Sequence, residues 1–169
     1  MWGKLQRLFR HRWLDEHDAR RAVPPDMVHR LMQRVAASER RHSGEIRIHV
    51  EAGLPLSYLW RGATARERAV ALFGKLRVWD TEANNGVLIY LLLAEHAIEL
   101  VADRGVNRHV PQHEWQAMVH RMGAAFRDGR FEDGLTQALE EVSAVLVQHF
   151  PLAEGTANPN ELPDEPSVG

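Results

Sequence analysis

One short stretch of the chain carries an oxygen-bearing side chain at nearly every second position. The residues are Asp80, Glu82, Asn84 and Asn85. A hard cation such as calcium takes roughly six to eight oxygen ligands at about 2.3–2.6 Å, and carboxylate and amide groups supply them. The stretch is not an EF-hand loop, because Gly86 comes one position late and Leu91 stands where that loop has its bidentate glutamate. The pattern therefore predicts a divalent-cation site of another kind.

Two strands would position this acidic segment. Residues 87–93 are apolar on both alternating faces, which is typical of a strand covered on two sides, and residues 97–102 form a second strand. The connection at residues 94–96 is so short that the two strands must be antiparallel neighbours. The start of one strand then lies beside the end of the other, so we expect Asp103 and residues 43–45 to converge with the acidic segment.

Two other interpretations of the same residues stay open. Asn84 and Asn85 could simply satisfy backbone groups in an ordinary polar turn, with Gly86 supplying an unusual backbone angle. Alternatively, Asp80, Asp103 and a neighbouring arginine could serve a weak metal-dependent phosphatase. The chain has no cysteine for a thiol route and no glycine-rich phosphate loop, and no catalytic residue is assigned.

The remaining pattern predicts an α/β fold. Residues 45–51 alternate strictly between polar and apolar types, as in a strand with one apolar face. Helical spacing predicts helices over residues 27–41, 65–76, 111–129 and 131–150. A right-handed crossover through the helix at 65–76 sets the first strand parallel to the second. We therefore expect a three-layer α/β/α sandwich with a small mixed sheet and helices on both faces.

Length and composition limit the class of protein. A chain of 169 residues with 44% hydrophobic and 26% charged residues fits one globular core. The formal net charge of −2 provides no basic field, so nucleic-acid binding is not expected. No organic cofactor is indicated, and an unidentified protein partner is possible. The absence of cysteine, of a secretory signal and of a long apolar run favours the cytoplasm.

We expect the globular domain at residues 24–150, with a different kind of segment at each end of the chain. Residues 1–23 read as an amphipathic helical extension, because Trp2, Leu5, Leu8 and Phe9 recur at helical steps among basic residues. This helix could pack on the domain or on a second subunit; the alternatives are peripheral membrane contact through residues 1–14, as a structural adaptor, or disorder. Residues 151–169 are rich in Pro, Glu, Asn and Gly, which predicts a disordered tail.

Several short motifs together resemble the TPM domain family, whose members include thylakoid-lumen phosphatase-like and photosystem-repair proteins. They are Ser43-Gly44-Glu45-Ile46, the helix with Arg66, Ala69, Leu72 and Phe73, Asn84-Asn85-Gly86-Val87-Leu88, Asp103-Arg104-Gly105, and the aromatic, glycine-punctuated stretch at 126–134. The resemblance covers about residues 24–150. It implies an α/β/α sandwich, divalent-cation binding in some members and a phosphatase activity proposed for some plant members. The combined prediction is a cytosolic binding module for calcium, another divalent cation or a protein partner.

Overall fold

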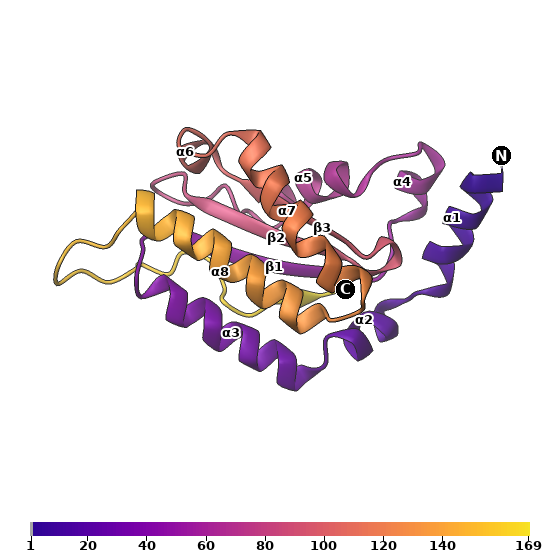
Figure 1. Cartoon of the computed structure of the whole chain (residues 1–169), viewed down its shortest axis with the longest axis horizontal. Coiled ribbons are helices and arrows are strands. Elements are labelled where there is room, and N and C mark those ends of the chain that lie inside the picture. Colours follow the sequence, from indigo (N-terminus) through magenta and orange to yellow (C-terminus); the bar gives the residue numbers. More distant parts are fainter. Residues whose placement is uncertain (1) are drawn as a thin grey trace.

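The structure is a computed structural model that describes residues 2–169. Met1, the first residue of the expected N-terminal extension, lies outside the described residues. The helices are α1 (Trp2–Trp13), α2 (Glu16–Ala22), α3 (Pro25–Glu39), α4 (Leu56–Trp60), α5 (Ala65–Lys75), α6 (Arg104–Asn107), α7 (Gln112–Arg127) and α8 (Phe131–His149), with a 3-10 turn at Leu93–Glu95. The strands are β1 (Glu45–Glu51), β2 (Gly86–Leu92), β3 (Ala97–Ala102) and β4 (Ser167–Val168) (Figure 1).

The four strands form one mixed sheet in the order β3-β2-β1-β4. β1 and β2 run parallel, with Glu45 opposite Gly86, and the crossover between them contains α5, as the sequence predicts. β2 and β3 are antiparallel, with Val87 opposite Ala102, which confirms the predicted hairpin. β2 is buried at every residue, because it lies between two neighbouring strands and is covered on both faces.

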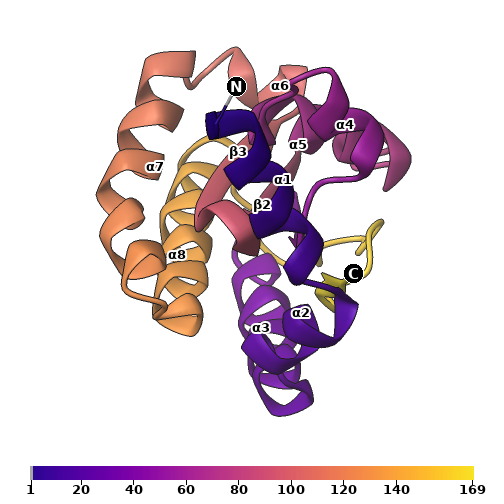
Figure 2. The same ribbon diagram turned by 90° about the vertical axis from the view of Figure 1, so that its right-hand side faces the viewer.

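Helices cover both faces of this sheet, so the predicted three-layer sandwich is confirmed. One core lies between the sheet and α3, α7 and α8, and the apolar residues of β1 at 46, 48 and 50 point into it. The second core lies under α4 and α5. β2 contributes Val87, Ile89 and Leu91 to the first core and Leu88, Tyr90 and Leu92 to the second. Figure 2 shows α7 and α8 on one side of the strands and α4 and α5 on the other.

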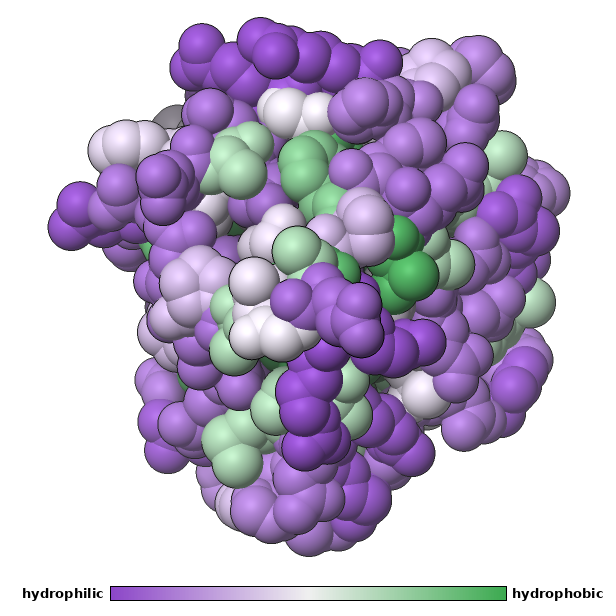
Figure 3. All heavy atoms as spheres, turned by 90° about the vertical axis from the view of Figure 1, so that its left-hand side faces the viewer, coloured by the Kyte–Doolittle hydropathy of each residue, from purple (hydrophilic) through white to green (hydrophobic). Residues whose placement is uncertain are grey.

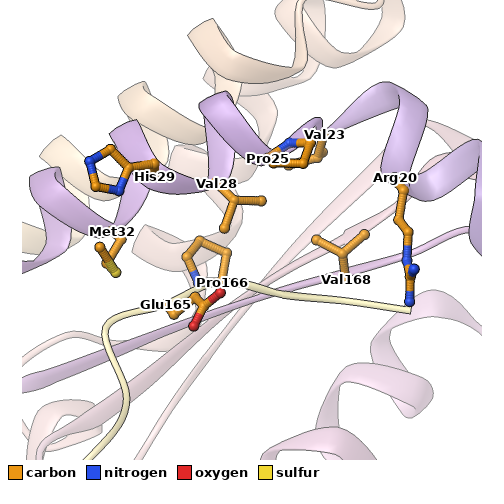
Figure 4. Close-up of a pocket in the computed structure, with 9 residues that line it drawn as sticks. All are labelled: Arg20, Val23, Pro25, Val28, His29, Met32, Glu165, Pro166 and Val168. Atoms are coloured by element: carbon orange, nitrogen blue, oxygen red, sulfur yellow. The ribbon is translucent and has the colours of Figure 1, made fainter.

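The C-terminal segment was predicted to be disordered, but it has a defined path in the structure. Residues 151–169 run back along the molecule, and β4 pairs in parallel with the outer edge of β1. The Arg47 guanidinium donates to the carbonyl oxygen of Pro163 at 2.9 Å, and Leu162 is buried in the second core. Pro166 lies opposite Val28 of α3 (Figure 4). Composition missed this placement because backbone hydrogen bonds and a few apolar contacts hold the segment.

Among the described residues, no helix combines the length and the apolar character needed to cross a bilayer. The cytoplasmic compartment stays a prediction from the sequence.

Candidate functional site

Three strands meet at one end of the sheet, where β1 and β2 begin and β3 ends. The backbone N–H of Glu45 donates to the carbonyl of Asn85 at 3.3 Å, and that of Asp103 donates to the carbonyl of Gly86 at 2.9 Å. The predicted proximity of the start of β2 to the residue after β3 is therefore present in the backbone. Figure 3 views the molecule from this end, where hydrophilic residues cover most of the surface.

A tight turn before β2 carries the buried amide of Asn85. Asn84 has a φ of 51°, in the left-handed region that asparagine tolerates better than most residues. The backbone N–H of Asn85 donates to the Thr81 hydroxyl at 3.1 Å, and the Asn85 side-chain amide donates to the carbonyl of Ser43 at 3.1 Å. Asn85 is completely buried and so ties the turn to the segment that precedes β1.

Asp103 connects β3 to the single-turn helix α6. Its Oδ1 accepts a hydrogen bond from the backbone N–H of Arg104, in the manner of an N-cap. Gly105 lies directly on the acidic turn: its N–H donates to the carbonyl of Asn84 at 2.9 Å, and a Cβ at this position would be 2.7 Å from the carbonyl of Ala83. Two carbonyl groups of the turn therefore lie against the loop that holds Asp103.

Two buried oxygen atoms of the sequence-predicted ligands have no hydrogen-bond partner in the protein. They are Oδ1 of Asn85, on a side chain with no exposure, and Oδ2 of Asp103, on a side chain that is 7% exposed. Buried polar atoms without partners are rare because each carries a desolvation cost of about 1–3 kcal/mol. Oxygen acceptors of this kind fit a hard cation, which would satisfy them together with carbonyl groups and water.

The other sequence-predicted ligands have no buried side-chain oxygen without a partner. The Asp80 carboxylate is half-exposed and accepts a hydrogen bond from the Arg77 guanidinium at 2.6 Å. Glu82 is exposed, and Asn84 offers its backbone carbonyl, which Gly105 contacts. Within residues 2–169, no three His, Cys, Asp or Glu side chains gather closely enough to hold a metal ion. Of the five expected ligands, Asn85 and Asp103 are therefore the two whose side chains carry a buried oxygen without a partner.

A group of buried carboxyls beside this edge was not anticipated from the sequence. The pKa of Glu39 is raised to about 9, mainly by burial. The nearby Glu45 and Asp164 contribute to the rise, and a hydrogen bond from the backbone N–H of Ile46 opposes it. Burial also raises the pKa of Glu45, whose Oε2 accepts from the N–H of Leu162 at 3.1 Å. The unpartnered Oε1 of Glu45 therefore belongs to a carboxyl that burial drives toward its neutral form. Helical spacing carried the signal, because Glu39 follows the buried Leu31 and Val35 at four-residue steps.

A surface groove lies elsewhere, between α3 and the C-terminal segment (Figure 4). Its lining is largely apolar, and its polar side chains Arg20, His29 and Glu165 are spread along it rather than aimed at one point. Ligand sites usually combine an apolar pocket with converging polar groups. The edge with Asn85 and Asp103 is therefore the stronger candidate.

Comparison with known proteins bears on the family and the fold of the chain. The model of the TPM domain matches residues 18–145, a range that includes Glu45, Asn85 and Asp103. The chain is similar to the NMR structure of the BA42 protein from the psychrophilic bacterium Bizionia argentinensis, with a TM-score of 0.72 and 26% identity over 85% of this chain and 93% of that chain. The N-terminal domain of a P. gingivalis protein has the same fold, with a TM-score of 0.58 and 20% identity over 72% and 76% of the two chains. No curated protein matches.

Proposed function

The chain belongs to the TPM domain family, and from this premise we propose that it is a binding module that holds a divalent cation, calcium in the first instance, at the edge where β2 begins and β3 ends. The observation that carries the proposal is the pair of buried, unpartnered oxygens on Asn85 and Asp103. Asp103 would supply the formal negative charge. Asn85 and the turn carbonyls would supply neutral oxygens.

This ligand set is specific to a hard cation. It contains oxygen donors alone, whereas zinc and the softer transition metals prefer imidazole or thiolate ligands. One carboxylate with neutral oxygens makes a site of low charge, so water would complete the coordination shell. Sites with few charged ligands bind calcium weakly, in the range of about 10⁻⁴–10⁻³ M.

The first prediction tests which of the two aspartates in the expected ligand set binds the cation. Calcium should shift the amide resonances of residues 81–86 and 103–105 of the full chain at millimolar concentration, and Asp103→Asn should weaken binding at least about tenfold, or about 1.4 kcal/mol. Asparagine is as good an N-cap as aspartate, so this variant keeps α6 capped. Isothermal titration calorimetry measures both affinities.

Asp80→Asn is the matched control, because it removes the same charge from a half-exposed side chain already paired with Arg77. It should leave calcium affinity within about twofold, since exposed ion pairs contribute little. If Asp80→Asn abolished binding and Asp103→Asn did not, the ligand assignment would be wrong. If the wild-type chain showed no shift at residues 81–86, the cation proposal would fail. Turnover of an aryl phosphate in the same samples would reveal the hydrolytic alternative.

A further inference from the structure

Helix α1 lies on the domain through its polar side. The imidazole of His11 is 4% exposed; its Nδ1 accepts from the backbone N–H of Leu54 at 3.0 Å, and its Nε2 lies 3.0 Å from Oε1 of Glu95. Arg7 Nε donates to the same Glu95 oxygen at 2.7 Å. Burial lowers the pKa of His11, so the ring is neutral and its Nε2–H donates to Glu95. Leu8 adds an apolar contact with the second core.

The apolar side of α1 consequently faces outward. Trp2, Leu5, Phe9 and Trp13 share one face of the helix and are 82%, 51%, 63% and 82% exposed. An amphipathic helix at the surface of a globular domain normally buries its apolar face and exposes its polar one. Here the order is reversed, which leaves a contiguous aromatic face without cover from the described residues.

Helix α4 extends this surface. Its Leu56 and Trp60 are 59% and 82% exposed. Arg7 of α1 donates to the carbonyl of Ala63, just beyond α4, which keeps the two helices adjacent. Figures 1 and 2 both place α1 and α4 at the same end of the molecule. Exposed apolar surface gathered in this way is typical of protein or membrane interaction sites.

The charge of residues 2–14 indicates what this surface binds. Residues 2–14 carry four basic side chains and no acidic one; Arg10 and Arg12 flank the aromatic face, and Lys4 is exposed farther round the helix. We infer that the outward face of α1, together with Leu56 and Trp60 of α4, docks on an anionic lipid surface. Tryptophan suits the interface between headgroups and acyl chains, and basic side chains flanking it attract anionic lipids.

A second copy of the chain fits this face less well. Symmetric pairing through α1 would place the basic residues of both helices side by side, and no acidic residue within residues 2–14 would offset their repulsion. A lipid surface instead offers negative charge and apolar depth in one plane. In this orientation the edge where β1 and β2 begin, at the end of the molecule opposite α1 and α4, faces away from the membrane (Figure 1).

Co-sedimentation with lipid vesicles tests this second prediction. The full chain should pellet with vesicles of phosphatidylcholine that contain roughly one-third phosphatidylserine, and far less with pure phosphatidylcholine. Trp2→Ala, Phe9→Ala and Trp13→Ala combined should lower the partition coefficient at least about tenfold, because the inserted apolar area is lost. Combined Lys4→Gln, Arg10→Gln and Arg12→Gln should lower it by a similar factor, and added salt should weaken wild-type binding.

Trp79→Ala is the matched control, since Trp79 is a half-exposed tryptophan outside this surface, and it should pellet like the wild type. Circular dichroism and the unfolding midpoint would confirm that every variant is folded. Equal pelleting of the wild type and the aromatic triple variant would overturn the inference. The inference would also be overturned if the wild type stayed in the supernatant. If sedimentation velocity then showed a wild-type dimer that the triple variant loses, the face would be a dimer interface instead. Calcium titration reports on the other end of the molecule, so the two proposals can fail separately.

Discussion

The substitution Gly86→Ala is expected to destabilise the domain by about 3 kcal/mol or more. A Cβ on Gly86 would lie 2.1 Å from the carbonyl oxygen of Val78 and 3.1 Å from its Cγ1. The close atom belongs to the backbone and cannot rotate away, and the Val78 side chain is completely buried. Relief therefore requires the segment before β2 to move, and this segment carries the acidic turn. Equilibrium urea unfolding measures the loss, and calcium affinity should fall with it.

Gly74→Ala provides the comparison. Gly74 lies in the exposed part of α5, and a Cβ there would meet nothing within 4 Å. Alanine has the higher helix propensity, so this variant should gain about 0.5–1 kcal/mol. Similar, small changes in both variants would show that the segment over Gly86 yields easily, contrary to the close approach described above.

Local patterns were sufficient to predict the layers of this fold. Strict alternation at residues 45–51 marks a strand with one apolar face, and uniform burial was expected where residues 87–93 are apolar throughout. The short connection between β2 and β3 allows only an antiparallel hairpin. The long connection between β1 and β2 allows a parallel pair joined by a crossover helix. Each inference depends on residues close together in the chain.

Features that depend on distant contacts were not predictable in the same way. β4 forms because the outer edge of β1 has free backbone groups, and no composition rule places Ser167 beside His49. The orientation of α1, with its apolar face outward, depends on the contact of His11 with Glu95, which lies 84 residues farther along the chain. Hydrophobic periodicity identified the face of α1 but not the direction in which it points.

The candidate site also has one part that was predictable from the sequence and one part that was not. Pairing of β2 with β3 placed the acidic turn beside Asp103, and this step followed from strand order. The choice among ligands did not, because it depends on side-chain partners: Asp80 turns to Arg77, whereas Asn85 and Asp103 keep buried oxygens free. Alternation of polar residues identifies a segment rich in oxygen, but not which of those oxygens are buried without a partner.

The buried carboxyl of Glu39 should make the domain lose stability in alkaline solution. Glu39 is 4% exposed and burial raises its pKa to about 9, whereas an unfolded chain ionises it near 4.5. Between these values unfolding releases a proton, so the contribution of Glu39 is complete below the unfolded pKa and is lost as the pH rises toward 9. Burial lowers the pKa of His42 and His49 to about 4, which reduces stability in acid below about pH 6.5. Above about pH 6.5 the two histidines are mostly neutral in both the folded and the unfolded state, so the pH dependence there reports on Glu39 rather than on the histidines.

Between pH 6.5 and 9 the free energy of unfolding of the wild type should therefore fall by up to about 1.4 kcal/mol per pH unit. Glu39→Gln keeps an oxygen that accepts from the Ile46 N–H and cannot ionise, so its unfolding free energy should be nearly constant over this range. Glu132→Gln is the control: pairing with Arg30 and Arg34 holds the pKa of Glu132 at about 2, so it is ionised in both states and its loss should leave the alkaline slope unchanged. Urea unfolding at fixed pH values measures the three slopes. An equally steep slope in Glu39→Gln would place the titrating group elsewhere, with Glu45 the next to test because burial raises its pKa as well.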